Sequence, residues 1–194
     1  IMTAISVSGK EGFDGSTITV ATPGTLDDLL ADYDKTTITE LTVVGNLNDG
    51  DISTLDGLPN LSGLDMEQVN LEIMPQYAFS LKSSLTSIKL PKTLKTIQSY
   101  AFYGCRNLTG ELVIPEGVIT IMKDAFSKCV GFTGNLVIPG SVTSIGENAF
   151  SECVGFTGDL VLPDDITSIG INAFWGCSGF TDIYCKSTTP PQLG

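Results

Sequence analysis

The side chains best able to do chemistry in this chain are its cysteines, four of which recur at a constant interval. They are Cys105, Cys129, Cys153 and Cys177, and a fifth follows at Cys185. If each 24-residue interval is one coil of a repeating structure, successive thiols lie about 5 Å apart, within reach of a disulfide or a thiolate metal site. The odd count, the absence of any CxxC pair, and Lys82 in the equivalent place one repeat earlier argue against both. We therefore interpret all five thiols as reduced and buried, filling a narrow core position.

Oxygen ligands gather in a second stretch, residues 46–57 (NLNDGDISTLDG). Its candidate ligands are Asn46, Asn48, Asp49, Asp51 and Asp56. Such oxygens around a glycine are typical of calcium loops, but the spacing and the terminal glutamate of an EF-hand are missing. Asn, Asp and Gly are also what any turn uses. We favour a turn, and we leave calcium open as the alternative.

Catalysis has little support in this sequence. The chain contains no histidine, which removes the commonest general base and the commonest metal ligand. The serines Ser127, Ser151 and Ser168 stand at repeat positions that carry other residues elsewhere, and no constellation meets the requirements of an active site. We expect no enzyme activity, no catalytic residue, no bound metal and no cofactor. The net charge of −12 also argues against binding to nucleic acid and to anionic membrane surfaces.

The elements that position these residues follow a period of 24. The dipeptide Ala-Phe occurs at 78–79, 101–102, 125–126, 149–150 and 173–174, and proline keeps the same interval from Pro91 to Pro163. A constant period of this length is the signature of a solenoid. Short strands begin each coil with an inward-facing pair. The pairs are Leu41/Val43, Leu64/Met66, Ile88/Leu90, Leu112/Ile114, Leu136/Ile138, Leu160/Leu162 and Ile183/Cys185. The sequence therefore predicts seven coils, their strands forming one parallel sheet.

Within one coil the order of elements can be read from residues 112–135 (LVIPEGVITIMKDAFSKCVGFTGN). The strand ends at Pro115, which has no amide hydrogen for a ladder. Val118 and Ile121 form a second inward pair on a short extended stretch. The Ala-Phe dipeptide, Cys129 and Phe132 complete the core, and Thr-Gly turns the chain into the next strand.

This pattern, L-x-I-P-x-x-V-x-x-I-x-x-x-A-F-x-x-C, resembles the BspA-type leucine-rich repeats of bacterial surface proteins. The match is best over residues 85–185, as in LVIPGSVTSIGENAFSEC, and looser in the first two coils. The resemblance implies a mainly β leucine-rich repeat, a right-handed superhelix poor in helix. Proline follows the strand where the better-known leucine-rich repeat carries Asn or Cys, so no asparagine ladder is expected.

Two regions follow from this reading: an N-terminal cap at residues 1–40 and the solenoid at 41–194. The cap is predicted to hold strands at Ile5–Ser8 and Thr17–Val20 and a helix over TLDDLLADY, with almost no α-helix outside residues 25–34. The chain closes on STTPPQLG with no second amphipathic cap. A solenoid needs its last coil covered, so we expect a fragment of a longer protein or an end that pairs with another chain.

The expected function is that of a recognition module that binds a protein. The side chains at the centre of each strand point outward in a regular row, in which the candidate contact residues are Lys89, Val113, Val137, Val161 and Tyr184. The turn side, with Tyr103 and Trp175, is the alternative contact surface. The resemblance implies an extracellular or cell-surface location with an outer-membrane anchor, and a host matrix or plasma protein as the partner.

Other functions stay open at this point. A glycan-binding surface subunit would need exposed aromatic platforms, for which Tyr103, Trp175 and Tyr184 are the candidates. A passive stalk or scaffold within a longer surface protein needs no ligand at all. No apolar run is long enough to cross a bilayer, so no direct membrane insertion is expected.

Overall fold

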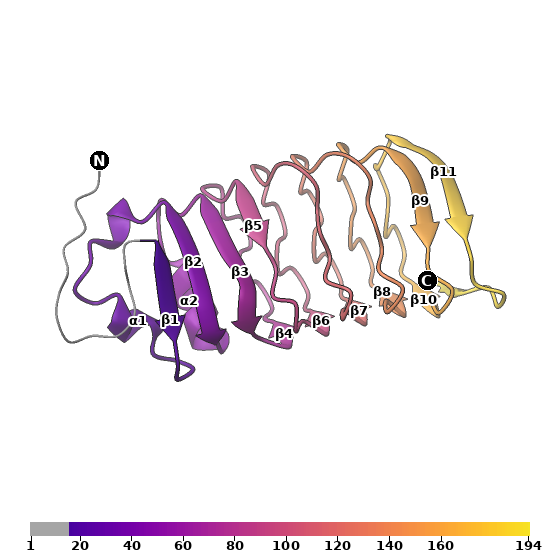
Figure 1. The fold of residues 1–194 in the computed structure, drawn as a ribbon. Coiled ribbons are helices and arrows are strands. Elements are labelled where there is room, and N and C mark those ends of the chain that lie inside the picture. Colours follow the sequence, from indigo (N-terminus) through magenta and orange to yellow (C-terminus); the bar gives the residue numbers. More distant parts are fainter. Residues whose placement is uncertain (1–15) are drawn as a thin grey trace.

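The structure of this protein is a computed structural model that describes residues 16–194. It is a mainly β solenoid of about seven turns, stacked in a single row (Figure 1). We number coils 1 to 7 from the inward residues Leu41, Leu64, Ile88, Leu112, Leu136, Leu160 and Ile183. The strand predicted at Ile5–Ser8 lies outside the described residues.

One side of the solenoid, toward the viewer in Figure 1, carries the longest strands. They are β1 (Thr17–Val20), β2 (Glu40–Asn46), β3 (Gly63–Asn70), β5 (Ser87–Lys89), β9 (Gly158–Leu162) and β11 (Phe180–Cys185). All pair in parallel, in the orders β1-β2-β3-β5 and β9-β11. β1 therefore extends the sheet beyond coil 1 by pairing with β2.

The prediction of one continuous seven-stranded sheet is wrong in the middle of this side. Residues 112–114 of coil 4 belong to no strand or bridge, and of residues 136–138 in coil 5 only Val137 forms a bridge, to Val161 of coil 6. Two more isolated bridges, Gly110 to Phe132 and Gly134 to Phe156, lie just before these segments. Each segment is three residues long and ends at a proline, Pro115 or Pro139. A proline offers no ladder donor and so ends each segment, but Pro91 and Pro163 follow the paired strands of coils 3 and 6 as well, so proline alone does not account for the interruption.

A second ladder runs without interruption through coils 2 to 7. Its strands have two residues each: β4 (Ile73–Met74), β6 (Thr96–Ile97), β7 (Thr120–Ile121), β8 (Ser144–Ile145), β10 (Ser168–Ile169) and β12 (Gln192–Leu193). Their order is β12-β10-β8-β7-β6-β4, with all pairs parallel. The sequence analysis identified this stretch as extended and inward-facing, but did not predict that it forms a sheet.

The Ala-Phe turns form a third line of contacts between coils. The amide of each phenylalanine donates to the alanine carbonyl of the next coil, as from Phe79 to Ala101 at 2.7 Å and from Phe102 to Ala125 at 2.8 Å. The bond repeats from Phe126 to Ala149 and from Phe150 to Ala173. Adjacent coils are therefore bonded on two sides even where the first sheet is interrupted.

Within residues 16–194, helix occurs only in the first turns of the solenoid. The elements are α1 (Leu26–Leu29), η1 (Lys35–Thr37) and α2 (Asp49–Asp56). The helix predicted over residues 25–33 is thus shorter than expected, and α2 contradicts the prediction that almost no α-helix lies outside 25–34. Asn48 and Asp51 form a capping box that begins α2, a motif that strongly favours a helix start.

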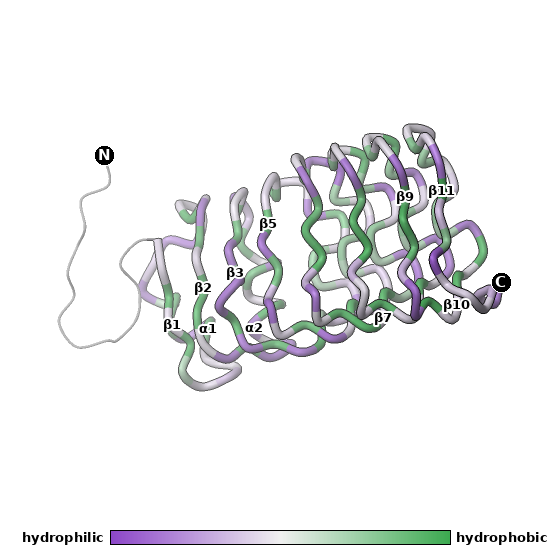
Figure 2. The backbone as a smooth tube through the Cα atoms, turned by 45° about the vertical axis from the view of Figure 1, so that its right-hand side comes forward, coloured by the Kyte–Doolittle hydropathy of each residue, from purple (hydrophilic) through white to green (hydrophobic). Residues whose placement is uncertain are grey.

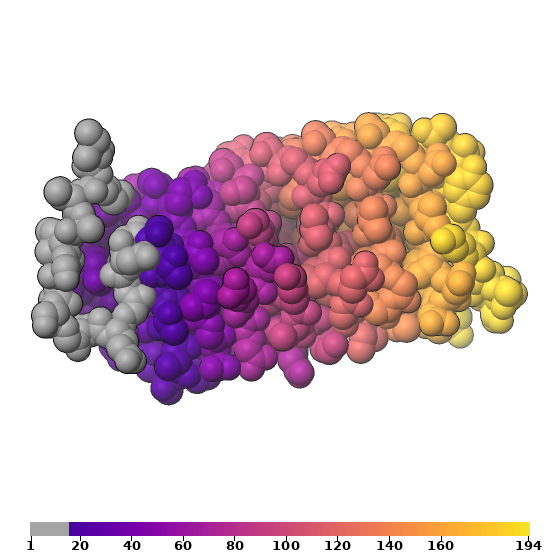
Figure 3. Space-filling view, viewed as in Figure 1, coloured from indigo at the N-terminus to yellow at the C-terminus, as the bar shows by residue number. Residues whose placement is uncertain are grey.

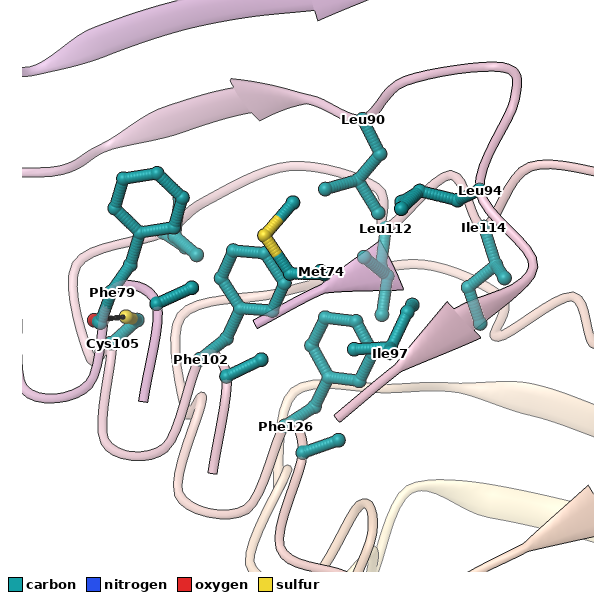
Figure 4. Close-up of a cluster of buried hydrophobic side chains, with 14 of the residues drawn as sticks. Met74, Phe79, Leu90, Leu94, Ile97, Phe102, Cys105, Leu112, Ile114 and Phe126 are labelled. Atoms are coloured by element: carbon teal, nitrogen blue, oxygen red, sulfur yellow. Dashed lines mark hydrogen bonds between the residues drawn. The ribbon is translucent and has the colours of Figure 1, made fainter. Parts of the chain in front are cut away.

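The core is a stack of identical side chains from successive coils. Phe79, Phe102, Phe126, Phe150 and Phe174 stack with ring centroids 5.1–5.7 Å apart. Figure 4 shows the first three of these rings. A second column, Phe132, Phe156 and Phe180, stacks at 6.2–6.3 Å. Offset parallel stacking at these distances is a favourable aromatic geometry, which explains why one residue type recurs at each position.

Each buried cysteine also makes a hydrogen bond. The Cys105 thiol donates to the Phe79 carbonyl at 2.8 Å, as drawn in Figure 4, and the same contact recurs once per coil. The other donors are Cys129, Cys153 and Cys177, each bonded to a phenylalanine carbonyl of the preceding coil. Lys82 takes this role in coil 2, where its ammonium donates to the carbonyls of Asp56 at 2.5 Å and Leu58 at 2.9 Å.

All five cysteines are free, as predicted, but one of them is not buried. Cys185 in β11 is exposed, and its inward-facing neighbour Ile183 is 61% exposed. The prediction that Cys185 is buried is wrong for the described residues, 16–194, none of which covers this side of β11. The other four thiols are buried.

Candidate interaction surface

The outward side chains at the centres of the first-sheet strands form a regular row, which we call the strand face. It is the front surface in Figure 3. In coils 1 to 3 the row is polar, with Thr42, Asp65 and Lys89. In coils 4 and 5 it becomes apolar: Val113 is 72% exposed and Val137 is 63% exposed. Figure 2 shows this change as the hydrophobic colour of the strand segments that follow β5.

Val137 and Val161 lie together in a groove of about 850 Å³ between coils 5 and 6. Their backbones form the bridge described above, and Val161 is half-buried while Val137 projects into solvent. The groove lies where the first sheet passes from unpaired segments to β9. Two of the predicted contact residues are thus in one recess, and Val113 is one coil away from it.

The electrostatics of this groove are acidic. Asp159, Asp164 and Asp165 line it and are exposed, and Lys186 is its only basic lining residue within the described part of the chain. An apolar floor with an acidic rim is the complement of a partner that carries apolar side chains flanked by lysine or arginine.

Lys89 and Tyr184 do not belong to this groove. The Lys89 ammonium is 2.7 Å from the carboxylate of Asp65, and this hydrogen-bonded pairing raises its pKa. Lys89 and Asp65 line a separate, smaller hollow of about 310 Å³ over coils 1 to 3. Tyr184 is 50% exposed on β11, outside both hollows. The row predicted as one contact surface is therefore divided into three parts.

The alternative contact residues on the turn side are also separated. Trp175 is 61% exposed, whereas Tyr103 is half-buried beneath the ammonium of Lys128, 5.4 Å from its ring centroid. The two occupy one column three coils apart, and the same position in the intervening coils is a buried serine, Ser127 or Ser151. They do not form one site.

Two stacked aromatic residues were not among the predicted contact residues: Tyr77, which is exposed, and Tyr100, which is half-buried. Each directly precedes an Ala-Phe dipeptide, and their rings stack with centroids 5.1 Å apart. The sequence held a signal for them: the equivalent residues in later coils are Asp124, Asn148 and Asn172, which are typical of exposed turns.

The oxygen-rich stretch 46–57 is accounted for by helix capping. The carboxylate of Asp51 accepts the amides of Gly24 at 2.6 Å, Leu26 at 3.0 Å and Asn48 at 2.9 Å. Asp51 thereby joins the segment at residues 24–26 to α2, and it is only 1% exposed. Among residues 16–194, no group of three or more His, Cys, Asp or Glu side chains is placed to hold a metal ion.

The buried thiols have no nucleophilic character at neutral pH. Desolvation raises the pKa of Cys105 to about 12 and that of Cys177 to about 11. It also raises the pKa values of Cys129 and Cys153 far above the ordinary range. Thiolate is the reactive form, so these four positions are structural.

The fold and this surface define a leucine-rich repeat solenoid. The family model described as the BspA type leucine-rich repeat region matches six copies over residues 33–133 and 96–190. The chain therefore belongs to the BspA-type leucine-rich repeat family. No curated protein sequence matches it.

Two solved structures share the fold. A leucine-rich repeat protein of T. pallidum is 24% identical, with a TM-score of 0.56 over 92% of this chain and 66% of that one. A leucine-rich repeat protein from Bacteroides ovatus is 19% identical, with a TM-score of 0.55 over 90% of this chain and 46% of that one. The present chain thus spans under two thirds of either relative. Across residues 16–194, no helix has the length and apolarity that a membrane span requires.

Proposed function

We propose that this chain is a non-enzymatic recognition module of a bacterial cell-surface or secreted protein, and that it binds a protein partner through the strand face. The observation that carries the proposal is the exposure of Val113 and Val137 beside the groove of coils 5 and 6. Removing apolar surface from water gains roughly 25 cal/mol per Å², so a partner that covers these valines is stabilised by them.

Charge defines the chemistry of the partner. The three aspartates of the groove and the net charge of −12 favour a segment in which apolar residues are flanked by lysine or arginine. Likeness to BspA-type surface proteins supports an adhesin-like role, with a host matrix or plasma protein as the partner. It also supports an extracellular location and an outer-membrane anchor supplied by other parts of the protein.

The substitution Val137→Lys tests the strand face. Lys89 occupies the same column in coil 3, so the fold accepts lysine there. We expect binding to a partner captured from a panel of extracellular matrix and plasma proteins to weaken at least tenfold, about 1.4 kcal/mol. Surface plasmon resonance with the purified variant is the measurement.

Val154→Lys is the matched control. Val154 is 51% exposed and follows Cys153, in the column that holds Arg106 after Cys105. The substitution Val154→Lys makes the same chemical change away from the strand face, and it should leave the affinity for the partner unchanged. Equal loss in both variants, or loss in Trp175→Ala alone, would place the contact elsewhere. A passive stalk would bind no member of the panel.

The acidic rim can be tested separately. Replacing Asp159, Asp164 and Asp165 together by asparagine keeps side-chain size and removes three charges. We expect slower association and a weaker dependence of that rate on salt, since rim charges act mainly on the encounter of the two proteins. An unchanged salt dependence would mean that the partner does not approach this groove.

A further inference from the structure

The charges of the strand face and its edge follow a definite order from coil 2 to coil 7. Coil 2 is acidic and coil 3 is basic, coils 4 and 5 are apolar, coil 6 is acidic and coil 7 is basic. The residues that set this order are Glu67, Lys92, Val113, Val137, Asp164 and Lys186. Read in the opposite direction, the same row has the opposite charge at each charged coil and an apolar residue at both middle coils.

Acid–base pairs flank the valines on both sides. In coils 2 and 3, the Lys92 ammonium is 2.8 Å from the carboxylate of Glu67, and the two side chains are 73% and 41% exposed. In coils 6 and 7, Asp164 and Lys186 are exposed and line the same groove. All four residues stand two or three positions beyond the centre of their strand segment, so they share one edge of the row.

A second copy of the chain can complement this order through a twofold axis. The strands of this side run across the row of coils (Figure 1). An axis parallel to the strands, between coils 4 and 5, turns one strand face toward the other and reverses the order of the coils. Coil 2 of one copy then faces coil 7 of the other, coil 3 faces coil 6, and coil 4 faces coil 5. Such a contact uses the same patch on both copies.

Opposite charges meet in this arrangement. The axis keeps the direction of the strands, so the end of each segment faces the end of its partner. Lys92 is then opposite Asp164, and Glu67 is opposite Lys186. The twofold symmetry makes each of these contacts occur twice. Between them, the valine of coil 4 in one copy faces the valine of coil 5 in the other.

The edge where the strands start is compatible with the same axis. Asp159 of coil 6 is opposite Ser87 of coil 3, and Glu111 of coil 4 is opposite Asn135 of coil 5. Among the described residues of coils 2 to 7, no two like charges stand directly opposite each other across the axis. Like charges placed in contact would cost several kcal/mol, so their absence favours this register.

We infer that the strand face is also the interface of a homodimer, in which two copies pack with their coils in opposite order. The inference rests on the proposed role of this face in binding a protein, and it names a second copy of the chain as one partner. The groove of coils 5 and 6 suits apolar residues flanked by lysine. Coils 3 and 4 of another copy present them as Lys89, Lys92 and Val113. The valines supply apolar burial and the charges fix the register, since an exposed ion pair contributes only about 0–1 kcal/mol.

The length of the row sets the strength of this dimer. Five steps of about 4.8 Å make the row from coil 2 to coil 7 roughly 24 Å long. A contact of this length is at the small end of specific interfaces, so we expect a reversible dimer with a Kd of about 1–100 µM. Dimerisation and the capture of another protein then exclude each other, because both cover Val113 and Val137.

The test is sedimentation equilibrium of the native chain without any other protein, at about 200 µM and low salt. The mass should approach twice the 20.5 kDa of one chain. Lys92→Glu and Asp164→Lys should each raise the Kd at least tenfold, because each substitution places like charges together twice. The fold accepts both, since Glu116 occupies the column of Lys92 one coil later. An equal mixture of the two variants should dimerise again, because the new glutamate of one then faces the new lysine of the other.

Lys123→Glu is the matched control. It makes the same charge change and also breaks an ion pair, the 2.8 Å contact with Glu147, but it lies beyond β7 and away from the strand face. It should keep the native Kd. The inference is overturned if the native chain has the mass of one copy at about 200 µM, if the mixture stays monomeric, or if the control loses the dimer equally. A monomer that still loses its panel partner through Val137→Lys would overturn this inference and keep the proposed function, whereas a dimer that binds no panel member would do the reverse.

Discussion

The cysteine column shows how one residue type can serve two purposes at once. Each thiol fills a narrow core position, as its spacing in the sequence predicted, and it also donates to a carbonyl of the preceding coil, which the spacing could not reveal. Lys82 at the equivalent position also donates a hydrogen bond, from its ammonium to the equivalent carbonyl, that of Asp56. An apolar residue of similar size would leave that carbonyl unpaired, which costs about 1–3 kcal/mol.

Thiol reactivity should therefore separate one cysteine from the other four. In the native protein under reducing-agent-free conditions, we expect Cys185 alone to react rapidly with a thiol reagent, because it is exposed. After denaturation all five should react. Mass spectrometry of the labelled peptides identifies the sites, and rapid native labelling of Cys129 would contradict the enclosed column.

Alkaline stability offers a second test of the same column. The folded-state pKa of Cys105 is raised from 9.0 to about 12 and that of Cys177 to about 11. As the pH rises, the thiols of the unfolded chain ionise before those of the folded protein. The stability that the buried, protonated thiols contribute is therefore fully present below pH 9.0 and is lost as the pH rises toward about 12. We expect the urea midpoint to fall over this range. In Cys105→Ser, which has no thiol to ionise there, the fall should be smaller; an identical fall would contradict the assignment.

At the scale of the elements, the sequence predicted the period and the coils, but missed the second ladder and the features that occur once. The period of 24 placed every coil and the inward pairs of most strands correctly. The helix α2 was missed because its capping residues, Asn48 and Asp51, resemble a calcium loop in composition. The interruption of the first sheet was also beyond prediction, because Leu-Val-Ile-Pro of coil 4 and Leu-Val-Leu-Pro of coil 6 are nearly the same sequence. Whether such short segments pair depends on the neighbouring coil.

Close contact between coils makes one glycine column sensitive. A Cβ at Gly155 would lie 2.1 Å from the Phe132 carbonyl oxygen of the preceding coil. Gly155→Ala should therefore destabilise the protein by about 1–3 kcal/mol, the cost of forcing apart a packed region. Gly140→Ala is the control, because its Cβ would meet nothing within 4 Å. Chemical denaturation of both variants gives the comparison, and equal midpoints would rule out the close approach.

At the scale of the whole molecule, the candidate surface was predicted only in part. The outward row could be read from strand alternation, and Val137 and Val161 do share a groove. That Lys89 pairs with Asp65 and lies in a different hollow depends on coil-to-coil contacts, which a one-dimensional pattern does not contain. The stacked tyrosines depend on the same contacts, because Tyr77 and Tyr100 come from different coils.

Amide hydrogen exchange should reveal the difference between the two sheets. Within the described residues, the amides of Val113 and Ile114 donate no backbone hydrogen bond, whereas Met122 of the same coil donates to Ile97 at 2.9 Å. We expect the amides of Val113 and Ile114 to exchange at least tenfold faster than that of Met122, because exchange of a bonded amide requires its hydrogen bond to open. NMR exchange rates measure this directly, and equal protection would indicate a continuous first sheet.

The unequal bonding of the two sides also has a mechanical consequence. Coils 3 to 5 are joined along β6, β7 and β8 and along the Ala-Phe turns, while the strand side between them is free of a ladder. A stack that is hydrogen-bonded on two sides and lacks a ladder on the third bends most easily toward and away from the third side. The spacing of Val113 and Val137 can therefore widen or narrow at little cost in broken hydrogen bonds. The strand face can match partners of somewhat different curvature while the phenylalanine columns behind it keep the coils in register.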